Sequence, residues 1–243
     1  MSAGVVAALS VEARTLGAPV RRGDGLSAIG DGTLVALSGI GYVAAAGAAH
    51  ALIDAGATAL VSWGMAGGLD PALHAGTICL PNVVISREGA SFGTDHHWRE
   101  LVGAAIAARL TVVGGKLLTS MRAIENVAGK AEAFRETGAA AVDMESVAVA
   151  EVAAGRGLPF IAVRVIVDTA GDKLPDAVLA ASNAGQVRFS RLMQELMRSP
   201  QDLVPLCRLA KRYRAATRAL VAVARTGALA PLAFAAAAAT RIA

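Results

Sequence analysis

Cysteine and aromatic side chains are scarce in this sequence. The two cysteines among its 243 residues, Cys79 and Cys207, lie far apart and form no CxxC motif, which argues against a disulfide framework and against a zinc site. We therefore expect a protein of the reducing cytoplasm. The N-terminus has no basic start, and its apolar run is too short for a secretory signal peptide.

Small and apolar residues are abundant instead. Hydrophobic residues make up 55% of the chain and there are 26 glycines, which suits a compact α/β protein and argues against disorder. The length predicts one α/β domain at residues 1–200 and an appendage at residues 201–243. From Arg198 onward there are eight basic residues and one acid, which give a net charge of +7. Because the net charge of the whole chain is +4, residues 1–197 have a net charge of −3. We expect the acidic body and the basic tail to have different roles.

Short apolar runs alternate with helical stretches along the first 170 residues. Helices are expected at residues 42–55 and 144–155, and strands at residues 4–9, 33–38, 58–63, 77–86, 139–142 and 159–167. Apolar runs of this length between helices are typical of buried parallel strands. The pattern predicts a three-layer α/β/α fold around a central, mixed but mainly parallel sheet.

Three acidic residues follow predicted strands. Glu12 follows the first strand, Glu145 follows residues 139–142, and Asp168 follows residues 159–167. The carboxyl ends of parallel strands lie at one edge of a sheet, where ligands bind in open α/β folds. Acids also stabilise helix N-termini, so either explanation suffices for one acid alone. The three acids together favour one shared site.

Two glycine-rich segments are predicted to form turns at the same edge. They are SGIG at residues 38–41 and GMAGG at residues 64–68. Backbone amides in such turns can approach an anion or a ribose closely, although most of these turns only connect a strand to a helix. Neither segment matches the GxGxxG dinucleotide motif or the GxxxxGK[ST] phosphate loop, so no resident cofactor is predicted.

Five segments resemble one enzyme family in the correct order. ALSVEA with Glu12, SGIGYVAAAGAAHAL (38–52), SWGMAGGLDPALHAGTICLPNVVI (62–85), AVDMES (141–146) and VRVIVDTAGD (163–172) are similar to the superfamily of purine nucleoside and uridine phosphorylases. The closest pattern is that of the methylthioadenosine/adenosylhomocysteine nucleosidases, over residues 3–195. The glycine-rich segment with a basic, apolar tail resembles the hopanoid-biosynthesis-associated phosphorylases, which implies removal of adenine from adenosylhopane.

The resemblance implies a role for each acid. Asp168 matches the acid that protonates N7 of the purine, Glu145 the carboxylate that binds the ribose hydroxyls, and Glu12 the carboxylate that activates water. Asp143 is interpreted as a cap or an ion-pair partner. Breaking an N-glycosidic bond requires a proton donor for the base and a poised nucleophile, which carboxylates supply. The resemblance places further substrate contacts at Met65, Gly67, Met144, Met121 and Arg122, although the last two lie where the family often has an aromatic residue.

The nucleophile stays open between water and phosphate. Phosphorylases of the superfamily have an Arg and a hydroxyl residue where this chain has Ser62 and Met65, and methionine donates no hydrogen bond to phosphate. Glu12 would also repel a phosphate dianion. Hydrolysis is therefore favoured, with inorganic phosphate as the alternative co-substrate. Candidate phosphate ligands are Gly39, Gly41 and Arg164, of which Arg164 is equally explained as a structural ion-pair partner.

Residues 94–100, TDHHWRE, are predicted to form a polar loop near the substrate mouth. The adjacent His96 and His97 point in different directions on a helix or a strand, so no metal site is expected. Trp98 is a candidate residue for lining the entrance to the site for an apolar substrate.

The basic tail has two interpretations. Basic residues at positions 208, 211, 212, 214 and 218 alternate with apolar ones, as in an amphipathic helix on an anionic membrane surface. A C-terminal helix that packs on the core has the same pattern. Gly227 and Pro231 disfavour a membrane span, and the tail contains no recognisable nucleic-acid module.

These observations predict an enzyme that releases adenine from a nucleoside, with adenosylhopane as the implied substrate. A general methylthioadenosine/adenosylhomocysteine nucleosidase or a purine nucleoside phosphorylase is the alternative, and a decayed nucleoside-binding relative is the non-enzymatic one. The resemblance further implies a homo-oligomer. A lipid-linked substrate implies peripheral contact with the inner face of the cytoplasmic membrane.

Overall fold

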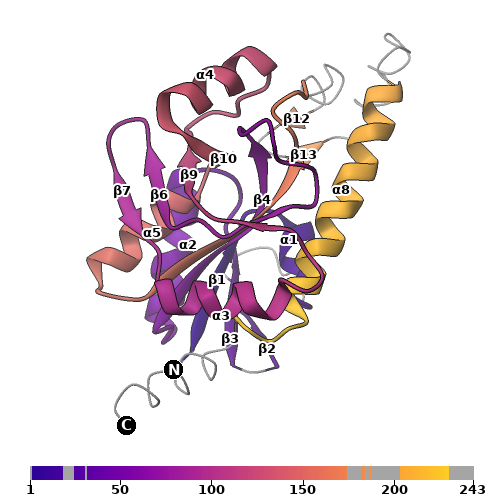
Figure 1. The fold of residues 1–243 in the computed structure, drawn as a ribbon. Helices are drawn as coiled ribbons and strands as arrows, with labels where there is room; N and C mark the ends of the chain where they lie inside the picture. The colour runs from indigo at the N-terminus through magenta and orange to yellow at the C-terminus, as the bar shows by residue number, and fades with distance from the viewer. Residues whose placement is uncertain are drawn as a thin grey trace.

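The computed structural model describes residues 2–18, 25–30, 32–173, 182–183, 186–187 and 203–229, and these form the predicted layers around a central sheet (Figure 1). Six of the strand pairs in the large sheet are parallel and four are antiparallel, so the sheet is mixed and mainly parallel, as predicted. Its strands are β1 (Ala3–Ala7), β2 (Ser27–Ile29), β3 (Thr33–Leu37), β4 (Ala59–Gly68), β5 (Ile78–Cys79), β6 (Val83–Ser86), β7 (Ser91–Gly93), β8 (Val112–Val113), β9 (Lys116–Thr119), β10 (Ala139–Asp143) and β11 (Phe160–Asp168). A short ladder joins β12 (Ser182–Asn183) to β13 (Gln186–Val187).

Strand β4 is the centre of the sheet because three strands pair with it. Its first half lies parallel to β1, its full length lies parallel to β11, and Gly67 and Gly68 at its end pair antiparallel with β10. The carboxyl ends of β1, β4 and β11 therefore meet at one edge, as the alternation of strands and helices predicted.

Two hydrophobic layers cover the sheet. On one face, α2 (Tyr42–Asp54) and α5 (Ser146–Gly155) contribute small buried residues such as Ala45, Ala49 and Ala153. On the other face, α1 (Ser10–Thr15), α3 (His96–Ile106) and α8 (Leu203–Ala224) pack against β4 and β11. Helix α4 (Val127–Thr137) covers the end of β10 with its own smaller cluster. The alanine-rich sequence suits this arrangement, because small side chains let helices approach a sheet closely.

Two expected elements differ in the structure. The predicted strand at residues 77–86 is divided into β5 and β6, because Pro81 lacks the N–H that a continuous ladder needs. The predicted polar loop at residues 94–100 instead forms the start of α3, where the Asp95 side chain accepts a hydrogen bond from Trp98 N at 2.8 Å and caps the helix. Trp98 is buried and donates to the carbonyl of Ala228, so it packs in the core and lines no substrate entrance.

The C-terminal helix packs on the same core as the rest of the sheet. Ala216, Ala219, Leu220 and Val223 of α8 are buried with Trp63 of β4, and α8 runs along the side of the molecule (Figure 1). Its apolar face is thus covered by protein, while basic side chains remain on its outer face. Among the helices in the described ranges, none is long and apolar enough to cross a bilayer. Residues 201–202 and 230–243 of the predicted appendage lie outside the described residues.

Candidate active site

A cavity of about 200 Å³ lies at the edge where the strands end. The three acids that the sequence singled out, Glu12, Glu145 and Asp168, all line it, although the first and the last are more than 150 residues apart in the chain. Glu12 lies in α1 directly after β1, Glu145 follows β10, and Asp168 ends β11. The topology of the sheet therefore brings the three carboxylates into one pocket.

Glu12 is buried at the floor of the pocket and held by two backbone amides. Its Oε2 accepts a hydrogen bond from Leu9 N at 2.9 Å, and its Oε1 accepts one from Met65 N at 2.8 Å. Burial raises the pKa of Glu12 to about 7, although the charge of Arg164 and the two amide hydrogen bonds oppose this shift. A carboxylate with this pKa can accept a proton near neutral pH.

The glycine-rich segment GMAGG is not a turn, as the sequence suggested, but the second half of strand β4. Its glycines leave room for functional side chains to lie directly on the strand. A Cβ atom on Gly64 would overlap Glu12 Oε1 and lie 2.5 Å from Arg164 Nη1, and one on Gly67 would lie 3.3 Å from Asp168 Oδ2. The strand continues because β11 pairs along the glycine-rich segment and β10 pairs with Gly67 and Gly68 at its end.

Arg164 is a fully buried cation beneath the pocket. Its Nη2 lies 2.7 Å from Asp143 Oδ2 and 3.7 Å from Glu145 Oε2, and it donates to Ser62 Oγ at 2.7 Å. Its Nε donates to Ser146 Oγ at 3.3 Å. Burial alone would lower the pKa of Arg164, but the surrounding carboxylates outweigh it and the pKa is raised. Arg164 therefore acts as the counter-ion of the acidic cluster.

Glu145 and Asp143 have different environments at the end of β10. Asp143 accepts hydrogen bonds from Thr119 Oγ1 at 2.7 Å and from Ser146, in addition to its ion pair with Arg164. The interpretation of Asp143 as a cap and ion-pair partner agrees with these contacts. Glu145 accepts from Gly41 N at 3.0 Å and from Met144 N at 3.3 Å, and burial raises its pKa. The amide of Gly41 is thus already used by a protein carboxylate.

Asp168 has a partner that the sequence reasoning missed. Lys130 of α4 is fully buried, and its ammonium group forms an ion pair with Asp168 Oδ2. Neither motif nor periodicity distinguishes Lys130, because a lysine in the first turns of a helix is usually a solvated side chain. Only the packing of α4 over the end of β11 brings the two charges together.

The remaining candidates divide between the cavity wall and the surroundings. Met65, Gly67, Met144 and Arg122 line the cavity, whereas Met121 is 63% exposed and does not. Gly39 and Arg164 also lie outside the lining. Much of the remaining wall is apolar and had not been singled out from the sequence; it includes Leu9, Ile40, Ile124, Val142 and Val167. The pocket thus combines a floor of carboxylates with hydrophobic sides.

Comparison with known proteins agrees with this architecture. The sequence matches the model of the phosphorylase superfamily over residues 26–198, more than half of the chain, and the chain therefore belongs to this family. It is an enzyme of the nucleosidase and phosphorylase type. A search of curated proteins finds no significant match to the sequence.

Solved structures share the fold at low sequence identity. The 5′-methylthioadenosine/S-adenosylhomocysteine nucleosidase of Neisseria meningitidis, in complex with methylthio-immucillin-A, has a TM-score of 0.70 at 20% identity over 93% of this chain and 97% of that one. The corresponding nucleosidase of Colwellia psychrerythraea, in complex with adenine, has a TM-score of 0.67 at 21% identity over 94% and 96%. Futalosine hydrolase of Helicobacter pylori has a TM-score of 0.67 at 17% identity over 92% and 97%.

Replacement of Gly64 by alanine tests the close approach of the Glu12 and Arg164 side chains to the backbone of β4. The added methyl group collides with the Glu12 carboxylate and the Arg164 guanidinium, both of which are buried and cannot move aside. We expect Gly64→Ala to lower the free energy of unfolding by about 1–3 kcal/mol, the usual cost of overpacking, as measured by urea denaturation.

Gly47→Ala is the matched control. Gly47 lies on the exposed side of α2, and a methyl group added there would meet no atom within 4 Å, so alanine should stabilise the protein by about 0.5–1 kcal/mol. Equal stability of the Gly64→Ala and wild-type proteins would contradict the account of the glycine-rich strand.

Proposed function

We propose that the protein hydrolyses the N-glycosidic bond of an adenine nucleoside and releases adenine. The observation that carries this proposal is the convergence of Glu12, Glu145 and Asp168 on one pocket, with the pKa of Glu12 raised to about 7. N-glycosidic cleavage develops positive charge on the ribose and negative charge on the base. Carboxylates near the sugar stabilise the first, and a proton donor at the base neutralises the second.

Each acid has a role in this proposal. Glu145 binds the ribose hydroxyls, with Met144 beside it packing against the sugar. Asp168 donates the proton of its carboxyl group to N7 of the purine as the bond breaks, and the Lys130 ammonium group balances the charge of the resulting carboxylate. Glu12 takes a proton from the water that attacks the anomeric carbon, which leaves a free hydroxyl on the ribose product. Met65, Gly67 and the segment at Arg122 complete the walls around the nucleoside.

Water is favoured over phosphate by the charges around the pocket. The guanidinium of Arg164 is already bonded to Ser62, Ser146 and Asp143, and the amide of Gly41 is bonded to Glu145. These two candidates for phosphate binding are therefore satisfied by protein groups. The buried carboxylates next to them would oppose the entry of a dianion.

The substrate that we propose is adenosylhopane, a lipid-linked adenine nucleoside. The apolar side chains of Leu9, Ile40 and Val167 in the cavity wall support a hydrophobic 5′-substituent. Ile40 is 36% exposed and Met121, beside Arg122, is 63% exposed, which leaves apolar surface next to the site. The similar nucleosidases are named for methylthioadenosine and adenosylhomocysteine, which are the alternative substrates.

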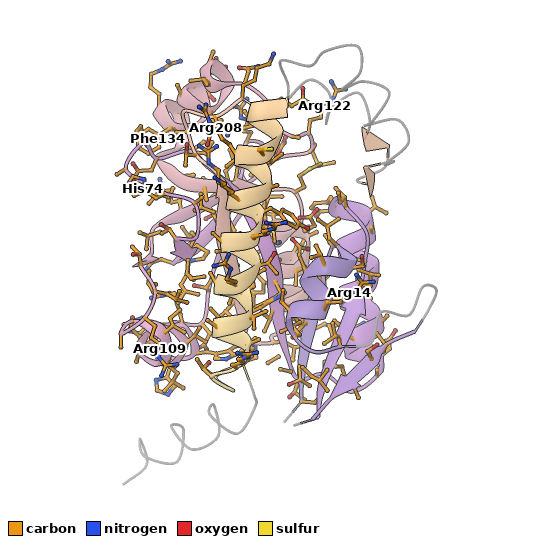
Figure 2. All side chains as sticks on the ribbon, turned by 90° about the vertical axis from the view of Figure 1, so that its right-hand side faces the viewer. Arg14, His74, Arg109, Arg122, Phe134 and Arg208 are labelled. Carbon is orange, nitrogen blue, oxygen red and sulfur yellow. The ribbon has the colours of Figure 1, made fainter. Side chains whose placement is uncertain are left out.

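We further propose a homo-oligomer and a peripheral membrane contact in the cytoplasm. A second copy of the chain would cover the apolar surface around Ile40 and Met121. The outer face of α8 supports the membrane contact, because its basic residues Arg208, Lys211, Arg214 and Arg218 are solvated and α8 contains no acidic residue. Figure 2 shows that Arg122, which lines the pocket, and Arg208 of α8 lie toward the same end of the molecule.

An adenine-release assay tests the proposed function. The protein is incubated with adenosylhopane in mixed micelles, with methylthioadenosine or with adenosine, each with and without phosphate, and adenine and sugar products are separated by chromatography. We expect adenine and a free ribosyl product from adenosylhopane, at a rate that does not depend on phosphate. Absence of adenine from all three substrates would exclude the enzymatic proposal. A ribose 1-phosphate product formed only with phosphate would replace hydrolysis by phosphorolysis.

The pH dependence of the reaction tests the role of Glu12. The base must be ionised, so kcat/KM should rise with pH up to about 7, where the pKa of Glu12 lies, and then level off. Glu12→Gln should reduce kcat by about 10²–10⁴-fold and remove this limb of the profile. A wild-type profile with its midpoint near pH 4.5, the ordinary value for a glutamate, would show that a different environment surrounds the base.

Sedimentation with lipid vesicles tests the membrane contact. A variant with Arg208, Lys211, Arg214 and Arg218 replaced by glutamine should bind phosphatidylglycerol-rich vesicles more than about tenfold more weakly than the wild type, since each basic residue near such a surface contributes about 1 kcal/mol. The control removes the same charge at four exposed arginines elsewhere, Arg14, Arg109, Arg135 and Arg156. Equal losses in the two variants, or no binding by the wild type, would contradict this proposal.

A further inference from the structure

Lys130 is a buried lysine whose hydrogen bonds to described residues are all made to the segment that begins with Asp168. Its Nζ contacts Asp168 Oδ2, and it donates to the carbonyl oxygens of Thr169 at 2.8 Å and Asp172 at 3.1 Å. An ammonium group has three protons, so these three acceptors satisfy it completely. The side chain is 0% exposed and cannot exchange these partners for water without a local rearrangement.

The same segment is tied to the C-terminal helix. Residues 169–172 form a tight turn, in which Asp172 N donates to the carbonyl of Thr169 at 3.0 Å. The Asp172 carboxylate accepts from Thr169 N at 2.8 Å and from Thr169 Oγ1 at 2.7 Å, which closes the turn. Arg212 of α8 lies 2.5 Å from the same carboxylate oxygen. The turn after Asp168 is therefore held by α4 on one side and by α8 on the other.

Within the described residues, this arrangement leaves one oxygen of Asp168 for a ligand. Lys130 occupies Oδ2, while no described residue donates a hydrogen bond to Oδ1. Asp168 lines the cavity, and its side chain is 12% exposed. A carboxylate without a fixed partner can rotate and present either oxygen, whereas an ion pair with an immobile ammonium group fixes its plane.

We infer that Lys130 is a positioning residue for Asp168, and that the Asp172–Arg212 pair makes the C-terminal helix part of the same assembly. The inference rests on the proposed function of Asp168 at the purine. Burying a lysine is costly unless its charge is paired, and an apolar side chain of similar length would fill the same volume without this cost. The buried charge of Lys130 lies in contact with Asp168, the proposed acid. Lys130 therefore orients the carboxyl group and balances its charge, without touching the substrate.

A double-mutant cycle on adenine release tests this role. Lys130→Met, Asp168→Asn and the double variant are compared with the wild type. If Lys130 acts through Asp168, Lys130→Met should lower kcat by about 10–100-fold with little change in KM, and should have an effect of less than about twofold when Asp168 is already asparagine. Lys116→Met, at an exposed lysine of β9, is the control and should keep the wild-type rate.

Single arginine-to-methionine substitutions test the role of the C-terminal helix α8 in the reaction. Arg212→Met should lower kcat several-fold, whereas Arg225→Met, at the exposed arginine that directly follows α8, should leave it unchanged, because Arg225 forms no ion pair with any described residue. Equal losses from Lys130→Met in the two backgrounds, with melting temperatures unchanged, would overturn the inference. An Arg212→Met variant with the wild-type kcat would remove α8 from the assembly.

A measurement without substrate separates this inference from the proposed function. In a ¹⁵N spectrum of lysine side chains, a buried ammonium group with three acceptors exchanges its protons slowly and gives a sharp signal at neutral pH. Asp168→Asn should shift this signal, and Lys116→Met should not. The absence of a sharp signal, or a signal that Asp168→Asn leaves in place, would overturn the inference even if the wild type releases adenine. A shifted signal in a protein that releases no adenine would support the ion pair and exclude only the proposed function.

Discussion

The buried guanidinium of Arg164 is the interaction on which the pocket depends. Asp143 and Glu145 lie within 3.7 Å of it, and Glu12 approaches it across the bare backbone of Gly64. Without this cation, three carboxylates could not be buried together, because each would face the others' charge in a medium of low dielectric constant. The compensation is partial, and burial still raises the pKa values of Glu12 and Glu145. Burial thus raises the pKa of the proposed base, and the charge of Arg164 limits this rise.

Glycine has an unusual function in this sheet. In many α/β proteins a glycine-rich segment after a strand forms a loop around a phosphate. Here the GMAGG segment stays in strand β4 and provides a surface without side chains, on which Glu12, Arg164 and Asp168 lie. Strand β11 pairs along this segment, β10 pairs with Gly67 and Gly68, and Met65 N donates to Glu12 Oε1, so these backbone groups are bonded to protein and are not available to an anion. The same geometry therefore supports water as the nucleophile.

Much of the site could be predicted from the sequence, since strand ends in a parallel sheet must converge. All three acids line the cavity, but only Glu12 and Asp168 follow this rule, because Glu145 reaches the cavity from β10, which pairs antiparallel with the end of β4. The rule does not predict which charged side chains come from the helices that pack over the sheet. Lys130 belongs to α4, and Arg212 belongs to α8, 44 residues after Asp168 in the chain. Trp98 shows the opposite error: its polar neighbours suggested an exposed loop, yet the indole is buried against α8.

The sequence by itself determined the alternation of strands and helices, and hence which acids follow the ends of strands, because the periodicity of apolar residues is a local property of the chain. Only the tertiary structure decided what surrounds each acid. Burial, the distance to a counter-ion and the space left by a missing side chain depend on residues far apart in the chain. These long-range contacts give Glu12 a pKa of about 7, commit Arg164 to protein partners and place Lys130 on Asp168.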